Sequence, residues 1–285
     1  MPMLCLAGAF RVVGSQPDGD SIRFRPDDPA GWAEVPGPYA VQRNASGAAQ
    51  LRLDGVDALE THYAAPGGGR IVHQPLRLAH AAAAELLDWL GFRDVVRNGE
   101  TVVRVRQDDQ PGFVLTRGAD LYGRCVALAG RGEPPAPSGE QVYVDVPLVR
   151  ATANHRLMGL GLAYPTFYTK LYADLRGELT LQARAAREAG AGVFADDLTQ
   201  TGVNVESLAT LTERAVIVPK LFRRLVEYLE LSNGDTSLAA FRDFLAQQDD
   251  RLWVIPTGAK TGFDTVVAVR GQTVRLTRVC ACGQA

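Results

Sequence analysis

One short stretch of the sequence, residues 51–60 (LRLDGVDALE), gathers side chains that could do chemistry together. Within it, Arg52, Asp57 and Glu60 bring one cation and two carboxylates near the end of an apolar-alternating run. Carboxylates bind hard cations such as Ca²⁺ and Mg²⁺, and guanidinium groups form strong charge-assisted hydrogen bonds with phosphate oxygens. These are the groups that hydrolysis of a phosphodiester requires.

The local sequence around these groups predicts how they are held. Leu51, Leu53 and Val56 have the alternation of strand core positions. Asp54-Gly55 is typical of a turn or bulge. We therefore expect a strand that bends at this dipeptide, so that the acids after it emerge from the sheet.

Two separate segments contain groups that would complete the site. DGDSIRF supplies Asp18 and Asp20 just before a predicted strand. DLYGR supplies Tyr122 and a second arginine, Arg124, after a predicted tight turn. The chemistry thus depends on three segments meeting in space.

In their order and spacing these segments resemble the staphylococcal nuclease (thermonuclease) family, whose pattern is DGD[TS], then R-x-x-x-x-D-x-P-E, then YGR. Arg52 precedes Asp57 by five residues and Glu60 by eight, as in the family, while Leu59 stands where the family usually has proline. The resemblance covers about residues 8–195. It implies an α+β fold, a five-stranded OB-type barrel with packed helices.

The resemblance also implies a calcium ion. Asp20 and Asp57 would bind it, together with water, the phosphate and the backbone carbonyl of Ala58. All-oxygen ligation of this kind suits a hard cation. Asp18 would orient the site without binding the metal itself.

The catalytic roles follow the same resemblance. Glu60 would orient or deprotonate a water molecule for in-line attack on phosphorus. Arg52 and Arg124 would bind the non-bridging oxygens and stabilise the charge of the transition state.

Three tyrosines are candidate substrate contacts. Tyr122 lies two residues before Arg124 and would stack on a base or hydrogen-bond a phosphate. Tyr164 and Tyr168 could stack on bases, although aromatic packing between helices is the favoured interpretation. The histidines, by contrast, have no ligand or triad spacing, so the sequence does not indicate a metalloprotease or a serine or cysteine hydrolase.

Composition limits the class of protein. The chain has 285 residues, of which 46% are hydrophobic, enough for the core of one large or two small domains. Its net charge of −2 gives no overall basic field, so affinity for nucleic acid would have to come from a local patch. This favours an enzyme with a small footprint over a protein that coats DNA.

Location is predicted from what the sequence lacks. No apolar run approaches the roughly 18 residues that span a bilayer. The N-terminus has no basic region before its apolar residues, so we expect no signal peptide. The four cysteines form no disulfide framework. We therefore predict reduced thiols and a cytoplasmic protein that does not enter a membrane.

Periodicity predicts the remaining elements. Residues 76–90 have helical spacing and end at a glycine, and the glycine-rich residues 64–69 predict a flexible loop bordering the site. Further predictions are a hairpin of residues 102–106 and 113–116, a helix over residues 171–189, helices over residues 205–218, 220–231 and 237–247, and strands over residues 252–255, 265–269 and 273–276. We expect two domains, the nuclease-like residues 1–197 and a small α+β domain of unknown role, residues 198–285.

The function expected from these observations is a calcium-dependent endonuclease that cleaves DNA, RNA or both with little sequence specificity. The alternative is a catalytically inactive nuclease-like module that binds nucleic acid or protein partners. Inactive copies tend to lose the acids and arginines first, because the fold does not need them. All five are present, which favours an active enzyme: Asp20, Arg52, Asp57, Glu60 and Arg124.

Overall fold

Five strands close into a barrel in the computed structural model, which describes residues 2–167, 171–254 and 259–277. The order is β1–β2–β3–β8–β7, and the barrel closes because β1 pairs with both β2 and β7. All neighbours are antiparallel except β3 and β8. The α+β barrel fold predicted from the sequence is confirmed. The strands are β1 (Pro2–Arg11), β2 (Ser21–Pro26), β3 (Ala49–Leu53), β7 (Gln110–Ala119) and β8 (Cys125–Arg131), and β9 (Gln141–Tyr143) extends the sheet beside β1.

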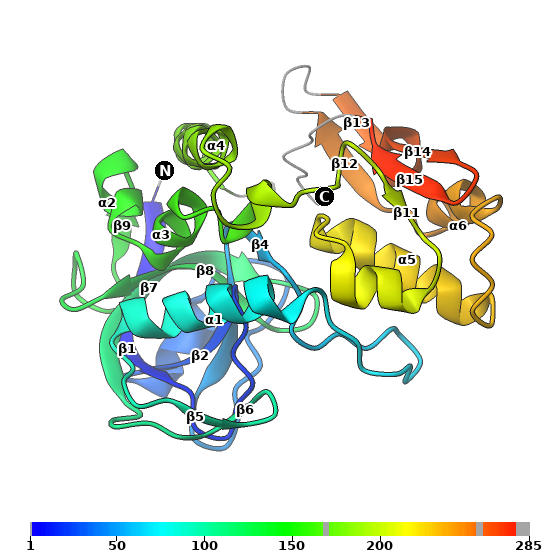
Figure 1. Cartoon of the computed structure of the whole chain (residues 1–285). Helices are drawn as coiled ribbons and strands as arrows, with labels where there is room; N and C mark the ends of the chain where they lie inside the picture. The colour runs from blue at the N-terminus through cyan, green and yellow to red at the C-terminus, as the bar shows by residue number, and fades with distance from the viewer. Residues whose placement is uncertain (1, 168–170, 255–258, 278–285) are drawn as a thin grey trace.

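Among the described residues, four helices pack on this barrel (Figure 1). The predicted helix over residues 76–90 is confirmed as α1 (Leu76–Leu90), which buries a face of leucine and alanine. Gly91 ends it with φ of +101°, and the N–H of Gly91 donates to the carbonyl of Leu87. The others are α2 (Val146–Arg150), α3 (Ala153–Gly159) and α4 (Ala173–Glu188), with 3₁₀ turns at Pro29–Glu34 and Gly192–Ala195.

The predicted hairpin of residues 102–106 and 113–116 is wrong. Instead, β6 (Thr101–Arg104) pairs with β5 (Val96–Asn98). Residues 113–116 belong to the long strand β7, whose two edges are taken by β1 and β8 to close the barrel. The short-range alternation was correct, but the pairing partner was set by barrel closure.

The C-terminal part contains helices on small sheets, as predicted, but the helix over residues 205–218 is wrong. Only Thr210–Arg214 is helical there, as a π-helix. The β-branched residues Val216, Ile217 and Val218 precede Pro219, which disfavours helical backbone before it. The other elements are β11 (Val203–Asn204), α5 (Pro219–Leu231), α6 (Phe241–Gln247), β12 (Arg251–Val254), β13 (Ala259–Gly262), a 3₁₀ turn at Phe263–Val266, β14 (Val267–Arg270) and β15 (Thr273–Leu276).

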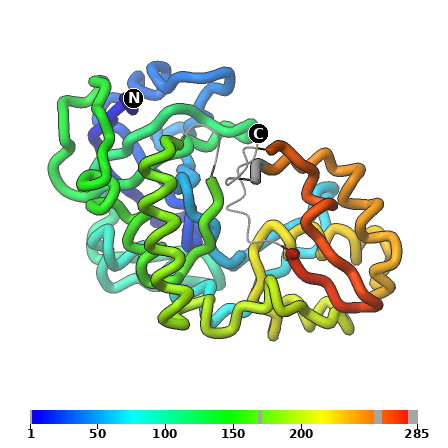
Figure 2. Tube along the Cα trace, turned by 90° about the horizontal axis from the view of Figure 1, so that it is seen from above, coloured from blue at the N-terminus to red at the C-terminus, as the bar shows by residue number. Residues whose placement is uncertain are grey.

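Buried apolar side chains form two clusters, one around the barrel and one around α5 and α6. Figures 1 and 2 show the two parts side by side. The C-terminal cluster also takes in Val72, with Tyr63 packed against it, from the segment between the barrel and α1. Backbone hydrogen bonds pair Tyr63 with Val72. The glycine-rich loop between them is therefore the end of a segment that extends from the barrel to α5. The domain boundary near Asp197 stays a prediction.

Two further observations concern the predicted location. No helix in the described part of the chain is both long and apolar enough to cross a bilayer. Cys5 and Cys125 are free buried thiols.

Candidate active site

The bend at Asp54-Gly55 carries the chain out of the barrel. Gly55 has φ of +82°, a conformation that strongly favours glycine, and a side chain there would meet Leu179 at 2.7 Å. After the bend, β4 (Gly55–Ala58) leaves the barrel and pairs with β10 (Ala163–Thr166). The expected turn is therefore present, and it brings Asp57 and Glu60 to the open end of β3.

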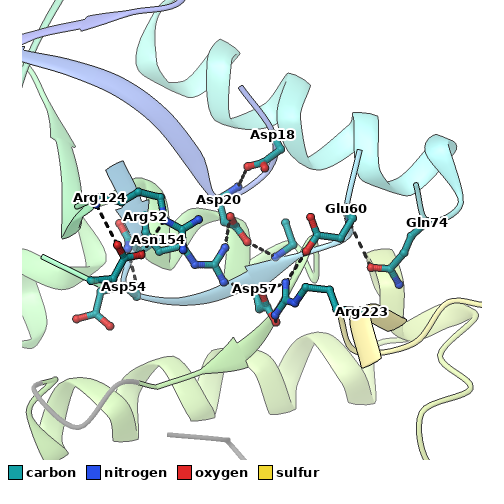
Figure 3. Close-up of polar contacts among 12 residues, drawn as sticks. Asp18, Asp20, Arg52, Asp54, Asp57, Glu60, Gln74, Arg124, Asn154 and Arg223 are labelled. Carbon is teal, nitrogen blue, oxygen red and sulfur yellow. Dashed lines mark hydrogen bonds and ion pairs between the residues drawn. The ribbon is translucent and has the colours of Figure 1, made fainter. Parts of the chain in front are cut away.

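Arg52 lies between the two predicted metal ligands (Figure 3). It forms ion pairs with Asp20 and with Asp57, the latter at 2.5 Å from Nη2 to Oδ1. The antiparallel pairing of β2 and β3 sets Ser21 opposite Arg52, which explains why Asp20 reaches it. Asp20 also accepts a hydrogen bond from the N–H of Ala58 at 2.7 Å. The three groups are thus held as one unit.

The pKa values of the two buried aspartates are shifted in opposite directions. Burial raises the pKa of Asp20 to about 7, an effect that neighbouring carboxylates increase and Arg52 opposes. In Asp57 burial is outweighed by the guanidinium groups of Arg223 and Arg52, which lower its pKa. Asp18 accepts a hydrogen bond from the N–H of Asp20 at 3.0 Å, and its orienting role stays a prediction.

Glu60 is anchored through its backbone. Its N–H donates to Oε1 of Gln74 at 3.2 Å, and its carbonyl accepts from the N–H of Gln74 at 2.9 Å. Gln74 is fully buried and also donates to the carbonyl of Ile217 at 2.8 Å. Burial raises the pKa of Glu60 although Arg223 opposes the change, which brings the carboxylate closer to the range suited to a general base.

Arg124 is positioned by the tight turn that the sequence predicted. Asp120 accepts hydrogen bonds from the N–H groups of Tyr122 and Arg124, and Gly123 takes φ of +77° in the turn. The Nε of Arg124 donates to Asp120 at 2.7 Å, and its guanidinium lies 5.5 Å from the centre of the Tyr122 ring. Tyr122 is 67% exposed, so its ring has a face available to a substrate.

The other two tyrosines contribute less. Tyr164 is only 3% exposed, its hydroxyl donates to Asp197 at 2.9 Å, and its ring packs edge-on against Phe194. This favours the packing interpretation over base stacking. Tyr168 lies outside the described residues.

The sequence interpretation missed Arg223, which enters the site from α5. It forms an ion pair with Glu60 and contacts Asp57 at 3.4 Å from Nη2 to Oδ2 (Figure 3). A signal was present, because Lys220, Arg223 and Arg224 recur at helical spacing on one amphipathic helix. That spacing predicts a basic face on the helix but not which residues the face contacts.

These groups line one cavity of about 860 Å³, whose walls come from both parts of the molecule. The barrel wall contains Asp18, Asp20, Arg52, Asp57, Glu60, Tyr122, Tyr164 and Arg124, and the C-terminal wall contains Val218, Lys220, Arg223, Arg224, Glu227, Phe263 and Leu276. The structure therefore brings the three predicted segments to a single site.

The donor chemistry of this site fits a hard cation. Four carboxylates, those of Asp18, Asp20, Asp57 and Glu60, face one cavity with Arg52 and Arg223 as their close cationic neighbours. Burial raises the pKa of Asp20, the neighbouring carboxylates of Asp18, Asp57 and Glu60 add to this rise, and Arg52 opposes it. Among the described residues, however, no three acidic, histidine or cysteine side chains converge as a ready ligand set. A cation would thus meet two carboxylates that Arg52 already bridges.

The cationic neighbours on the C-terminal wall have their own partners. Lys220 donates to Asp250 at 2.8 Å, and Arg224 forms ion pairs with Asp250 and Glu227. The hydroxyl of Tyr63 donates to Glu227, so this network also joins the barrel to α5.

Comparison with known proteins found no protein-family model that matches this chain and no matching curated protein. The resemblance to the staphylococcal nuclease family accordingly depends on the three motifs.

Proposed function

We propose that this protein is a metal-dependent endonuclease that hydrolyses phosphodiester bonds of DNA or RNA, with calcium as its metal. The observation that carries the proposal is the meeting of Asp20, Arg52, Asp57, Glu60 and Arg124 in one cavity, from three segments far apart in sequence. Chance surface charges would not be expected to converge in this way.

Each group has a role that its position supports. Asp20 and Asp57 would hold the cation, with the carbonyl of Ala58 as a further donor, and the ion would supply positive charge beside the phosphate. Glu60 accepts a proton from a water molecule as the water oxygen bonds to phosphorus and the bond to the leaving oxygen breaks.

The arginines balance the charge of this step. Arg124 is one-third exposed and lies at the cavity wall, where its guanidinium can donate to the non-bridging oxygens and assist the leaving oxygen. Arg52 adds positive charge while it fixes the spacing of Asp20 and Asp57. Tyr122 offers a ring face to a base beside the reacting phosphate.

The first test is cleavage of a fluorescent single-stranded DNA and the matching RNA, with Ca²⁺ or with EDTA. We expect cleavage in millimolar-range Ca²⁺, because two carboxylates without a full protein cage form a weak calcium site. Asp20→Asn keeps an acceptor for the Ala58 N–H but removes one negative charge, so it should raise the Ca²⁺ concentration for half-maximal rate. Full cleavage in EDTA, or rescue by Zn²⁺ alone, would refute the assignment.

A second candidate function is a non-catalytic module that binds nucleic acid or protein. It is favoured by one observation, namely that both Asp57 and Glu60 are paired with Arg223 in this structure. Oligonucleotide binding without cleavage at any Ca²⁺ concentration would support it.

A further inference from the structure

Arg223 takes the same carboxylate oxygens that the proposed reaction needs. Its Nη1 pairs with Oε1 of Glu60 and lies 3.5 Å from Oδ1 of Asp57, while its Nη2 lies 3.4 Å from Oδ2 of Asp57. The contact joins residues 166 positions apart in the chain. One guanidinium therefore engages both the proposed base and a proposed metal ligand.

The position of Arg223 is imposed by the docking of α5. Phe222, the preceding residue, packs edge-on against Tyr63, with ring centres 6.2 Å apart. The hydroxyl of Tyr63 donates to Glu227, one turn further along α5, and Gln74 binds the carbonyl of Ile217 just before the helix. These contacts are made by residues on both sides of Arg223 in the sequence. They hold α5 so that the Arg223 guanidinium faces the carboxylates of Asp57 and Glu60 and not open solvent.

Arg223 nevertheless has room to leave. Its side chain is 25% exposed and lines the cavity of about 860 Å³. The docking contacts of α5 are made by other residues, so the side chain can rotate into the cavity while the helix stays in place.

A guanidinium and a divalent cation compete for a carboxylate oxygen. Arg52 pairs with Oδ1 of Asp57, and Nη2 of Arg223 lies 3.4 Å from Oδ2, so Arg223 contacts the second oxygen of this proposed metal ligand. Each oxygen that accepts from Arg223 is withdrawn from a cation, and two positive groups within a few ångströms repel each other strongly in a partly buried site.

We propose that Arg223 is an internal counter-cation that competes with the divalent cation for Asp57 and at the same time pairs with the proposed base Glu60, so that the C-terminal part holds the site in a restrained state. The proposal rests on the proposed metal-dependent function, whose regulation it describes. Metal binding requires Arg223 to move aside, and any partner that shifts α5 would raise the affinity of the site for Ca²⁺.

The test is Ca²⁺ binding to the full chain by isothermal titration calorimetry, in wild type and Arg223→Gln. If the paired state holds nine-tenths or more of the molecules, its removal should tighten Ca²⁺ binding by about tenfold or more. Arg224→Gln is the matched control. It removes the same charge from the neighbouring residue, but the Arg224 guanidinium pairs with Asp250 and Glu227 and not with the proposed site. A general loss of positive charge would strengthen binding in both variants, whereas competition predicts the large effect only in Arg223→Gln.

Thermal unfolding supplies a second readout that needs no catalysis. In EDTA, Arg223→Gln should unfold at a lower temperature than wild type, because Asp57 and Glu60 lose a counter-charge. Saturating Ca²⁺ should raise its Tm by more than it raises that of wild type. Near-UV circular dichroism checks that the variant is folded.

The outcomes separate this inference from the function it rests on. Ca²⁺ binding of equal or lower affinity in Arg223→Gln, with the wild type binding normally, overturns the competition and leaves the metal site intact. No Ca²⁺ binding by either protein overturns both proposals.

Discussion

A substitution at Glu60 can separate the proposed cleavage step from oligonucleotide binding. Its backbone is fixed by Gln74, so a change of its side chain leaves the local chain in place. Its carboxylate is partnered by Arg223 alone among the contacts that the structure describes, so the substitution disturbs one ion pair and no packed core.

For Glu60→Gln we predict a fall in single-turnover cleavage rate on the order of 10²- to 10⁴-fold, because the amide keeps the shape but cannot accept the proton. Oligonucleotide affinity, measured by fluorescence anisotropy with Ca²⁺, should change far less. Near-wild-type cleavage would end the proposed role of Glu60.

The same residues show what local sequence can predict about a site. Arg52, Asp57 and Glu60 lie on one strand and its continuation, so their spacing along the chain fixes their relation in space. Arg223 has no such relation to them, because it approaches through the docking of a distant helix. Its side chain could be recognised as charged from sequence, but its partners depend on tertiary packing.

At the scale of elements, the helices α2, α3 and α4 are joined by one buried carboxylate. Glu178 of α4 is 5% exposed and accepts hydrogen bonds from Arg150 of α2 at 2.9 and 3.0 Å. It also lies 2.9 Å from Nε2 of His155 in α3. The hydrogen bonds from Arg150, with a further one from His155, lower the pKa of Glu178 to about 2 against the opposing effect of burial.

This carboxylate predicts a pH dependence of stability. Because its folded pKa lies below the ordinary value of 4.5, its contribution is fully present above pH 4.5 and is lost as the pH falls toward 2. We expect Tm to fall more steeply across this window in wild type than in Glu178→Gln. Glu188→Gln, at the exposed end of the same helix, is the control and should follow the wild type. Parallel curves for wild type and Glu178→Gln would contradict the prediction.

Elements were predictable where the pattern was strong and local. The helix α1 was found with its bounds, because leucine and alanine recur on one face and Gly91 ends it. The pairing of β7 and the extended backbone at Val216 were not found, since barrel closure determines the first and burial of Val216 in the barrel cluster determines the second.

At the scale of the whole molecule, each of the two apolar clusters contains residues from the other part of the chain. Val72 and Tyr63 leave the barrel to pack with α5, while Val216 from the C-terminal side packs in the barrel cluster. The cavity is formed where the two parts meet. A proposed boundary near Asp197 therefore cuts through no strand or helix, but it separates Val72 and Tyr63 from the C-terminal cluster and Val216 from the barrel cluster.

We predict that residues 1–197 alone fold and cleave a short oligonucleotide, because the barrel closes on its own strands. The truncated protein should be less stable, by on the order of 1–3 kcal/mol for each large apolar side chain that loses its cover. Near-UV circular dichroism and thermal unfolding measure this. A molten product without near-UV signal would show that the parts share one core. If Arg223 competes with the metal, this protein should also bind Ca²⁺ more tightly than the full chain.

The late position of α5 in the chain has a consequence for biosynthesis. All five barrel strands are complete at Arg131, whereas α5 begins at Pro219. Domains generally fold as units and N-terminal first during translation. The carboxylates of Asp57 and Glu60 are therefore assembled on the ribosome before Arg223 has been made. The nascent barrel passes through an interval in which its site is open, and the last helices to emerge bring the guanidinium that closes it.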